Sequence, residues 1–369
     1  MLKQVKKSVL GTVKFVGGFN ALSKSSWRRD RLLILGYHGL SLKDEHEWDP
    51  TLFMPPEMFR ERLESMLEFG CSILPLSDAV RRQRDGTLPE RAVAITFDDG
   101  FYNFFEAALP ILKEFDVPAS VYVTTYYSLK KWPVFPIAVG YLIWKARDKT
   151  CELEIENCVS GTFELSDEAV RASLHAKIHE FSLTEELSAT EKNDLLKLLC
   201  GQLGLDFDDF GRERLFNLMT TDEIREVSDA GIGVELHTHR HRMPTEKSLF
   251  DREINDNRDV IFETTGILPS HFCYPSGNYD PMYFDWIAKN GVESATTCDT
   301  GLMERSTHLM QVPRLIDTAS LSKIEFEGWL TGAAALIPKR ELVRSLPAPA
   351  LIKLVPIEQL EMLSIAGSF

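Results

Sequence analysis

The chain has 369 residues, 44% of them hydrophobic, which is enough for one large domain with insertions or for two smaller domains. The formal net charge of −14 argues against a nucleic-acid-binding protein, because such proteins need a positive surface. The six cysteines are scattered without a Cys-x-x-Cys pair, which indicates reduced thiols and favours a cytoplasmic location.

Residues 1–31 form a basic segment with eight lysines and arginines and one aspartate, so the rest of the chain carries −21. Its apolar residues recur every three or four positions, as on one stripe of an amphipathic helix. The segment is too short and too polar to span a bilayer, and no convincing signal-peptide cleavage site follows it. Two hypotheses are open: peripheral contact with an anionic membrane, or a helix that packs on the domain or forms a mobile arm.

From residue 32 onward, short apolar runs alternate with stretches of helical spacing. Strands are expected at residues 32–35, 72–74, 92–97 and 119–124. Helices are expected at residues 59–67, at a segment capped by Ser77, and at residues 102–115 with a kink at Pro110. This alternation predicts a parallel sheet.

Residues 128–220 interrupt the alternation with an aromatic-rich stretch and a long, charged stretch of helical spacing. We expect a mainly helical insertion above the carboxyl edge of the sheet, where insertions shape substrate clefts. His175 and His179 are four positions apart here and form a second candidate metal pair. No carboxylate motif accompanies them, so we favour an exposed helix face.

The strand–helix alternation resumes with Thr221 as the expected cap of a helix over residues 222–230. Strands follow at residues 231–236, 271–274, 293–296 and 310–315, and helices at residues 248–265 and 281–290. The pattern predicts an α/β fold in which residues 32–320 form a barrel and residues 321–369 form a C-terminal tail.

Four predicted strands end in polar residues, at His38, Asp98-Asp99, His237–His241 and Tyr274–Gly277. A parallel barrel gathers its active site from the carboxyl ends of its strands, so these residues are expected to meet. Adjacent carboxylates point in different directions after a strand, so one can bind a cation while the other moves a proton. One carboxylate oxygen and two imidazole nitrogens are a common ligand set for catalytic zinc, although other first-row ions also suit it.

Three motifs resemble those of the polysaccharide deacetylase family, also called the NodB homology domain or carbohydrate esterase family 4. Thr96-Phe97-Asp98-Asp99-Gly100 matches its first motif residue for residue, and His237-Thr238-x-x-His241 matches its His-(Ser/Thr)-x-x-His motif. Phe272-Cys273-Tyr274-Pro275-Ser276-Gly277 resembles one form of its third motif. By order and spacing, the resemblance covers about residues 32–128 and 221–318. It implies a distorted (β/α) barrel of about seven parallel strands.

The resemblance also implies metal-dependent hydrolysis of N-acetyl groups from an amino-sugar-containing glycan or glycan precursor. It makes Asp99, His237 and His241 the ligands of a divalent metal, with Zn²⁺ the first expectation. Asp98 would be the general base and a metal-bound water the nucleophile. Contacts to the substrate and the oxyanion are expected from Tyr274, Pro275, Ser276 and Gly277.

The chain departs from the family pattern at two points. Cys273 stands where one branch has an arginine that pairs with the base, and Arg314 is our candidate for its replacement; a surface or core arginine is the alternative. The late Leu-x-His motif that supplies a general acid has no clear counterpart. His38, His239 and His308 are therefore rival candidates to protonate the leaving amine, and we favour His38 because it directly follows a predicted strand.

Two other functions are kept open by these departures. An amidohydrolase or esterase with another small substrate would use the same site, and a non-catalytic glycan-binding protein could share the fold. The expected partner is an N-acetylated glycan or sugar and not a nucleic acid. The expected location is the cytoplasm or, through the basic N-terminus, the periphery of a membrane.

Overall fold

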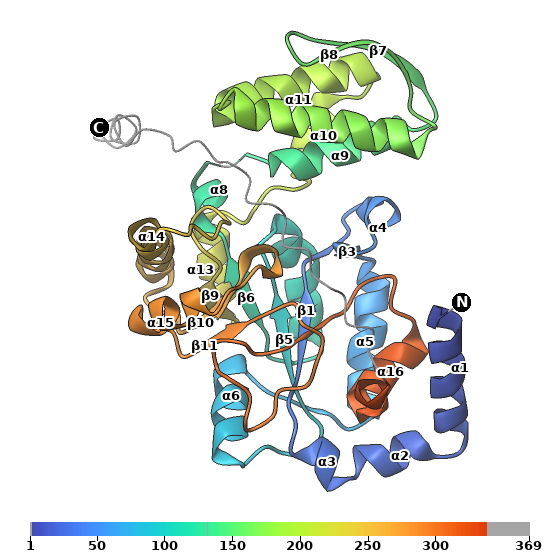
Figure 1. Ribbon diagram of the computed structural model, residues 1–369, viewed down its shortest axis with the longest axis vertical. Helices are drawn as coiled ribbons and strands as arrows, with labels where there is room; N and C mark the ends of the chain where they lie inside the picture. Colours follow the sequence, from blue (N-terminus) through green and yellow to red (C-terminus); the bar gives the residue numbers. More distant parts are fainter. Residues whose placement is uncertain (1, 131, 338–369) are drawn as a thin grey trace. The chain divides into compact units, whose positions relative to one another are not determined.

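The computed structural model describes residues 2–130 and 132–337. Within this part of the chain, the main sheet has eight strands, and all of them pair in parallel. Seven follow in the order β11-β10-β9-β6-β5-β1-β12, and β4 lies beside β5. Among these strands, Figure 1 labels β1, β5, β6, β9, β10 and β11. The strands are β1 (Leu33–Tyr37), β4 (Ser72–Ile73), β5 (Ala92–Phe97), β6 (Ser120–Val123), β9 (Gly233–Leu236), β10 (His271–Cys273), β11 (Ser294–Thr296) and β12 (Leu315–Ile316).

The two edges of this sheet are linked by the segment that leads into β12. Val312 forms an isolated parallel bridge with Thr296 of β11, and three residues later Leu315 pairs with Leu35 of β1. The sheet therefore curls round on itself, which confirms the predicted distorted barrel of about seven parallel strands. Every residue of β1 and β5 is buried, as expected for parallel strands that are covered on both faces.

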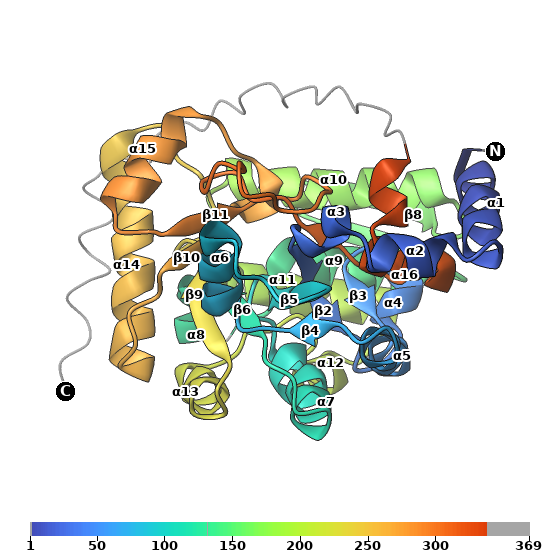
Figure 2. The same ribbon diagram turned by 90° about the horizontal axis from the view of Figure 1, so that it is seen from below.

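Helices cover the outer side of the strands, as Figure 2 shows for α5, α7, α13 and α14. The helices of the barrel are α5 (Pro56–Glu68), α6 (Leu76–Asp85), α7 (Leu109–Glu114), α8 (Thr125–Lys130), α13 (Thr221–Asp229), α14 (Lys247–Thr265), α15 (Met282–Lys289) and α16 (Lys323–Thr331). Shorter elements are β2 (Gly39–Leu40), α4 (Glu45–Trp48), β3 (Phe53–Met54), the 3₁₀ turns η2 (Pro275–Gly277) and η3 (Ala333–Leu336), and the π-helical turn η1 (Phe104–Ala108). Of the predicted tail, residues 321–337 contain α16 and η3, and residues 338–369 lie outside the described residues.

The predicted helix starts differ from the observed ones at three places. Ser77 does not cap α6, which begins after Pro75; instead its hydroxyl hydrogen-bonds to Nε2 of His271 at 2.9 Å. The cap of α13 is Thr220 and not Thr221, because Thr220 and Glu223 form a reciprocal capping box. The helix predicted from residue 102 with a kink or break at Pro110 begins largely as the π-helical turn η1 and becomes α7 only at Leu109, so the irregularity lies directly before Pro110.

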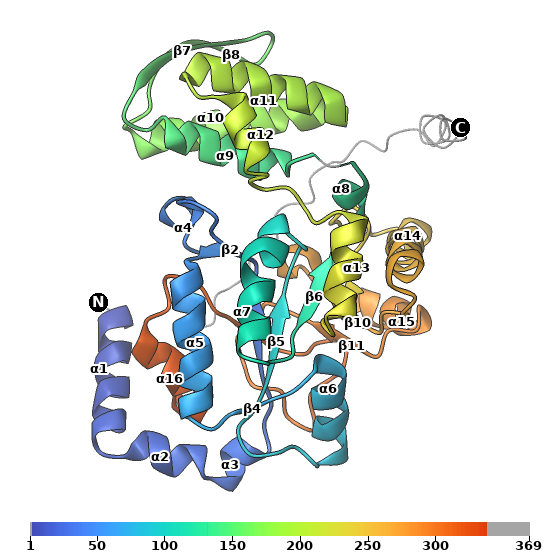
Figure 3. The same ribbon diagram turned by 180° about the vertical axis from the view of Figure 1, so that it is seen from behind.

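The insertion has a small core of its own, and Figure 3 shows it from behind. It contains α9 (Phe135–Lys145), α10 (Glu168–Thr184), α11 (Ala189–Leu203), α12 (Phe207–Arg212) and an antiparallel hairpin of β7 (Thr150–Ile155) and β8 (Val159–Glu164). The hairpin was not among the predicted elements, although buried and exposed residues alternate along β7. His175 and His179 stack on each other, and Nε2 of His175 donates to the Pro136 carbonyl, so His175 ties α10 to α9.

The basic N-terminal segment folds as α1 (Leu2–Phe15), α2 (Gly18–Ser23) and α3 (Ser26–Arg29). Leu10 of α1 is buried against α16, and Lys6 and Lys14 form ion pairs with Glu325 and Glu327. Packing on the domain is thus the alternative that the structure shows, and this packing gives the membrane hypothesis no support. Among the described helices, none combines the length and the hydropathy that a membrane span requires.

Arg28 of α3 is fully buried, although no carboxylate among the described residues forms an ion pair with it. Its guanidinium donates to the carbonyls of Leu330, Arg31 and Ala92, at 2.8, 2.6 and 3.3 Å. Burial lowers its pKa to about 10, so the side chain is still a cation at neutral pH. The N-terminal segment therefore closes the amino-terminal end of β5.

Candidate metal and catalytic site

A carboxylate and two imidazoles meet at the carboxyl ends of β5 and β9. Nε2 of His237 lies 3.1 Å from Oδ1 of Asp99, and Nε2 of His241 lies 3.2 Å from the same oxygen. Among the described residues, this is the group of three or more His, Cys, Asp or Glu side chains whose ligand atoms lie close enough together to hold one metal ion. The structure thus brings together all three metal ligands that the sequence analysis named.

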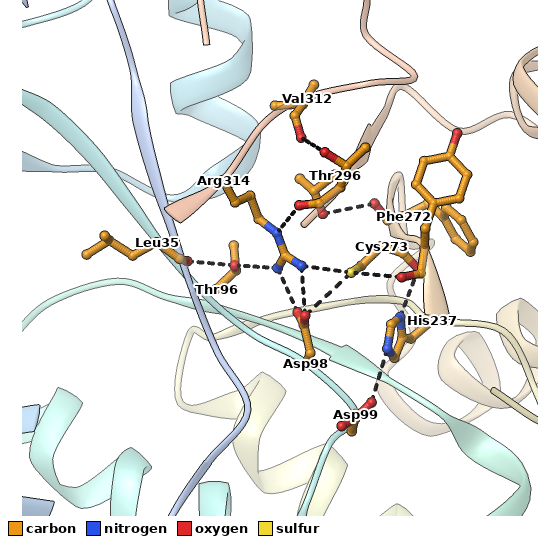
Figure 4. Close-up of polar contacts among 12 residues, drawn as sticks. Leu35, Thr96, Asp98, Asp99, His237, Phe272, Cys273, Thr296, Val312 and Arg314 are labelled. Atoms are coloured by element: carbon orange, nitrogen blue, oxygen red, sulfur yellow. Dashed lines mark hydrogen bonds and ion pairs between the residues drawn. The ribbon is translucent and has the colours of Figure 1, made fainter. Parts of the chain in front are cut away.

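Backbone conformation aims these side chains. Asp99, with φ 69°, His241, with φ 55°, and Thr238, with φ 62°, all occupy the left-handed region. That conformation is unfavourable for residues with a Cβ, so the surrounding structure must hold it in place. The turn at Asp99 separates its carboxylate from that of Asp98, so the two point to different partners, as Figure 4 shows.

The hydrogen bonds of His237 are those expected of a histidine that binds a metal through Nε2. Its Nδ1 donates to the carbonyl of Cys273 at 2.8 Å. In the tautomer that this bond selects, the lone pair on Nε2 faces Asp99. Two acceptors at 3.1 Å repel each other unless a cation or a proton lies between them. This donor set, one carboxylate oxygen and two imidazole nitrogens, therefore fits a divalent first-row metal.

The electrostatics of the group also favour a positive charge at this point. Burial raises the pKa of Asp99, but the two imidazoles lower it, and the net pKa is well below its ordinary value. Burial lowers the pKa of His241, but Asp99 raises it, and the net pKa is above its ordinary value. A divalent cation bound here would lie against the ionised carboxylate of Asp99 and would displace any proton held by the imidazole nitrogens that bind it.

Asp98 and Arg314 form a buried, bidentate ion pair directly beside this group (Figure 4). Nη1 and Nη2 of Arg314 each lie 2.7 Å from one carboxylate oxygen of Asp98, and the two side chains are 0% and 3% exposed. Burial raises the pKa of Asp98, but the guanidinium lowers it more, so the net pKa is below its ordinary value. Asp98 is therefore ionised at neutral pH.

Neighbouring groups fix the guanidinium from all sides. Its Nε donates to the carbonyl of Thr297, its Nη1 also donates to the Thr96 hydroxyl, and its Nη2 lies 3.1 Å from Sγ of Cys273. A Cβ on Gly36 would lie 3.2 Å from Nη1 of Arg314 and 2.7 Å from a methyl carbon of Ile316. The structure thus places Arg314 in the interior and not on the surface, and Gly36 leaves the space for it.

After Cys273, the third-motif residues leave the backbone of the turn η2 as the candidate contact to the oxyanion. Tyr274 is fully buried, and its hydroxyl donates to the Met310 carbonyl. The N–H of Gly277 donates to the Tyr274 carbonyl, whereas Ser276 is exposed and has φ 56°. Because the Gly277 N–H already donates within the turn, the N–H of Ser276 is the better candidate for an oxyanion donor.

The three rival general acids have different surroundings. His239 is held by the Thr125 hydroxyl at Nδ1, and His308 stacks on Phe284 and accepts the N–H of Met310. His38 follows β1 directly, and the register that pairs Tyr37 with Phe97 places His38 beside Asp98 at the carboxyl ends of two neighbouring strands. Of the three histidines, His38 is thus the one that lies next to Asp98 in the sheet order.

Sequence reasoning missed the residues that support this site. Thr96 was quoted only as part of a motif, yet its hydroxyl accepts from Arg314 and donates to the Leu35 carbonyl. Gly36, Glu253 and Asn257 were not considered at all. The only local signal for the last two is their spacing of four on a predicted helix, which many surface helices share.

A parallel barrel with a metal-competent group and an arginine-paired aspartate at the carboxyl ends of its strands defines a candidate hydrolytic centre. The sequence model of the polysaccharide deacetylase family matches residues 85–149 and 174–295, about half of the chain. The chain belongs to this family.

Individual relatives agree with this membership. The poly-beta-1,6-N-acetyl-D-glucosamine N-deacetylase of Escherichia coli K12 is 28% identical over 99 residues, which covers 27% of this chain and 14% of that protein. The enzyme of the same name from Staphylococcus epidermidis is 24% identical over 112 residues, which covers 28% of this chain and 39% of that one. The chain thus spans less than half the length of these curated relatives.

A solved structure shares the fold. The deacetylase PplD of Streptococcus pyogenes, in complex with acetate, superposes with a TM-score of 0.52 at 19% sequence identity. The superposition covers 79% of this chain and 94% of that one, so most of that protein has a counterpart here.

Proposed function

We propose that this chain is a metal-dependent deacetylase that removes N-acetyl groups from an amino-sugar-containing glycan or glycan precursor. Family membership supports the reaction class. The observation that carries the proposal is the arginine-paired carboxylate of Asp98 beside the metal-competent group of Asp99, His237 and His241. This arrangement supplies one ionised base and one cation site next to each other, as amide hydrolysis by water requires.

Asp99, His237 and His241 would hold the divalent ion, most simply Zn²⁺. Such an ion lowers the pKa of a bound water towards about 7 and polarises the amide carbonyl. Asp98 accepts the proton that the attacking water loses, since Arg314 keeps this carboxylate ionised and fixes its orientation. The N–H of Ser276, in the turn η2, would stabilise the oxyanion.

His38 donates the proton that the leaving amine needs. The C–N bond then breaks to release acetate and a free amino sugar, and the proton lost by water is balanced by the one gained by nitrogen. His239 and His308 are the alternatives, and both rings already have partners in the structure.

The substrate in the names of the two N-deacetylases above suggests which compounds to test first. Oligomers of β-1,6-linked N-acetylglucosamine head the substrate panel, followed by β-1,4-linked oligomers and by small acetamides and acetate esters. Turnover of the small compounds alone would favour the amidohydrolase or esterase alternative. Tight glycan binding without acetate release would favour the binding-protein alternative.

The decisive experiment measures metal content and acetate release on the same preparations. We expect about one divalent ion per chain in the wild type and loss of that ion in His241→Ala, with His175→Ala as a matched imidazole control. Asp98→Asn is expected to keep the ion and to lose at least about 100-fold in acetate release. Unchanged turnover in Asp98→Asn would refute its role as the base, and a wild type that binds no zinc would refute the mechanism.

A further inference from the structure

The loop that carries both candidate metal imidazoles is strained, and one helix holds it. Thr238 and His241 have φ values of 62° and 55°, so two of five consecutive residues adopt the left-handed conformation without being glycine. Within the loop, the Arg242 N–H donates to the Thr238 hydroxyl at 3.1 Å. Other bonds come from α14, which lies beside β9. A loop of this kind keeps its shape only if its surroundings impose it.

Asn257 of α14 fixes the start of the loop with all three polar positions of its amide. Oδ1 accepts the backbone N–H of His237 at 3.0 Å, and Nδ2 donates to the Val123 carbonyl and the Thr125 hydroxyl, each at 3.0 Å. The Thr125 hydroxyl in turn bonds Nδ1 of His239 at 2.8 Å. Asn257 is fully buried, so this one side chain joins the end of β6 to the end of β9 in a site without water to replace it.

Glu253, one helical turn earlier, fixes the middle and end of the loop. Its backbone carbonyl accepts the N–H of His239, and Oε2 accepts the N–H of Arg240 at 2.8 Å. Oε1 accepts from the guanidinium groups of Arg240 and Arg242 at 3.1 and 2.6 Å. Glu253 is 1% exposed, and a spacing of four places it on the same face of α14 as Asn257.

We propose that Asn257 and Glu253 are positioning residues that preorganise the imidazoles of His237 and His241 for the metal. They touch neither the metal position nor the reacting atoms, and they act by holding the strained loop between the two rings. This inference rests on the proposed metal-dependent function. It predicts that their loss weakens metal binding while the Asp98–Arg314 pair, which has no hydrogen bond to either residue, stays intact.

The test is the affinity of the full chain for Zn²⁺, measured by competition with a chromophoric chelator, together with the visible spectrum of the Co²⁺ form. We expect Asn257→Leu and Glu253→Gln each to weaken Zn²⁺ binding about 10- to 100-fold and to alter the Co²⁺ bands, as loss of outer support does in other metal sites. Asn257→Asp, which keeps the acceptor for the His237 N–H but loses the donors, is expected to lie between Asn257→Leu and the wild type.

The matched control is Asn255→Leu, which removes an amide from the exposed face of the same helix and should leave affinity and spectrum unchanged. All measurements are made at a temperature well below the thermal unfolding midpoint of each metal-free variant. If Asn257→Leu does not fold, Asn257→Asp is measured in its place. Wild-type affinity and an unaltered Co²⁺ spectrum in both Asn257→Asp and Glu253→Gln would overturn this inference alone. Absence of Zn²⁺ binding in the wild type would overturn the proposed function, and the positioning roles with it.

Discussion

Replacing Arg314 by methionine is predicted to destabilise the fold and to protonate Asp98. The change keeps most of the side-chain volume but removes both hydrogen bonds to a carboxylate that is only 3% exposed. Breaking a buried ion pair by deleting one partner typically costs about 3–5 kcal/mol, because the remaining charge stays buried without compensation. With the guanidinium gone, the largest effect that lowers the pKa of Asp98 is lost while burial still raises it, so this pKa is expected to rise.

The prediction is measured by denaturant unfolding and by the pH dependence of acetate release. The free energy of unfolding is expected to fall by about 3–5 kcal/mol, and the acid limb of the activity profile should move to higher pH. Arg62→Met is the matched control, since Arg62 is 3% exposed and bonds the buried Asp317 at 2.9 Å. This control should lose comparable stability without moving the activity profile.

A double-mutant cycle tests the physical reasoning directly. The double variant with Asp98→Asn and Arg314→Met removes both charges. Its loss of unfolding free energy is therefore expected to be smaller than the sum of the losses in the two single variants by about 2 kcal/mol or more. A coupling energy within about 0.5 kcal/mol of zero would mean that the ion pair does not set the energetics of this site. An activity profile that stays in place in Arg314→Met would show that the arginine does not control the ionisation of Asp98.

Three further predictions concern residues around the site. Burial raises the pKa of Glu235 on β9 to about 7 from an ordinary value of 4.5, so the free energy of unfolding of the wild type should fall as pH rises through that interval. Glu235→Gln should remove roughly 3 kcal/mol of this pH-dependent loss. An unchanged dependence of the unfolding free energy on pH in Glu235→Gln would contradict the prediction. Arg28→Leu leaves three carbonyls without their donor and should cost at least about 2 kcal/mol in thermal unfolding, whereas the exposed Arg29→Leu should stay within about 0.5 kcal/mol. Gly36→Ala forces a methyl group against Arg314 and Ile316, so kcat should fall while zinc stoichiometry is unchanged; wild-type kcat would argue that the guanidinium has room to shift.

The sequence predicted the parts of the fold that local patterns determine. The strand at 92–97 is β5 to the residue, because a largely apolar run of only six residues is typical of a strand that is covered on both faces. The carboxyl-edge location of the site followed from the predicted strands and the polar residues at their ends, and Asp99, His237 and His241 do meet there. The hairpin of β7 and β8 was missed because its alternating residues lie between strongly helical stretches and pack only within the insertion.

The interactions that complete the site could not be deduced from local patterns. Asp98 and Arg314 are 216 positions apart, so no periodicity relates them, and the arginine was named only because the expected position holds Cys273. Asn257 and Glu253 matter because of which backbone groups they reach, and this depends on how α14 lies against β9. Three-dimensional proximity of this kind becomes visible only in the folded chain.

The position of Arg314 makes the order of synthesis matter for this protein. During synthesis Asp98 is added early, whereas its counter-ion Arg314 is added more than two hundred residues later, on the segment that joins β11 to β1. A nascent chain that stops before this segment has an open sheet edge and an aspartate without its arginine. Closure of the barrel and pairing of Asp98 with its counter-ion therefore belong to the same late step of folding.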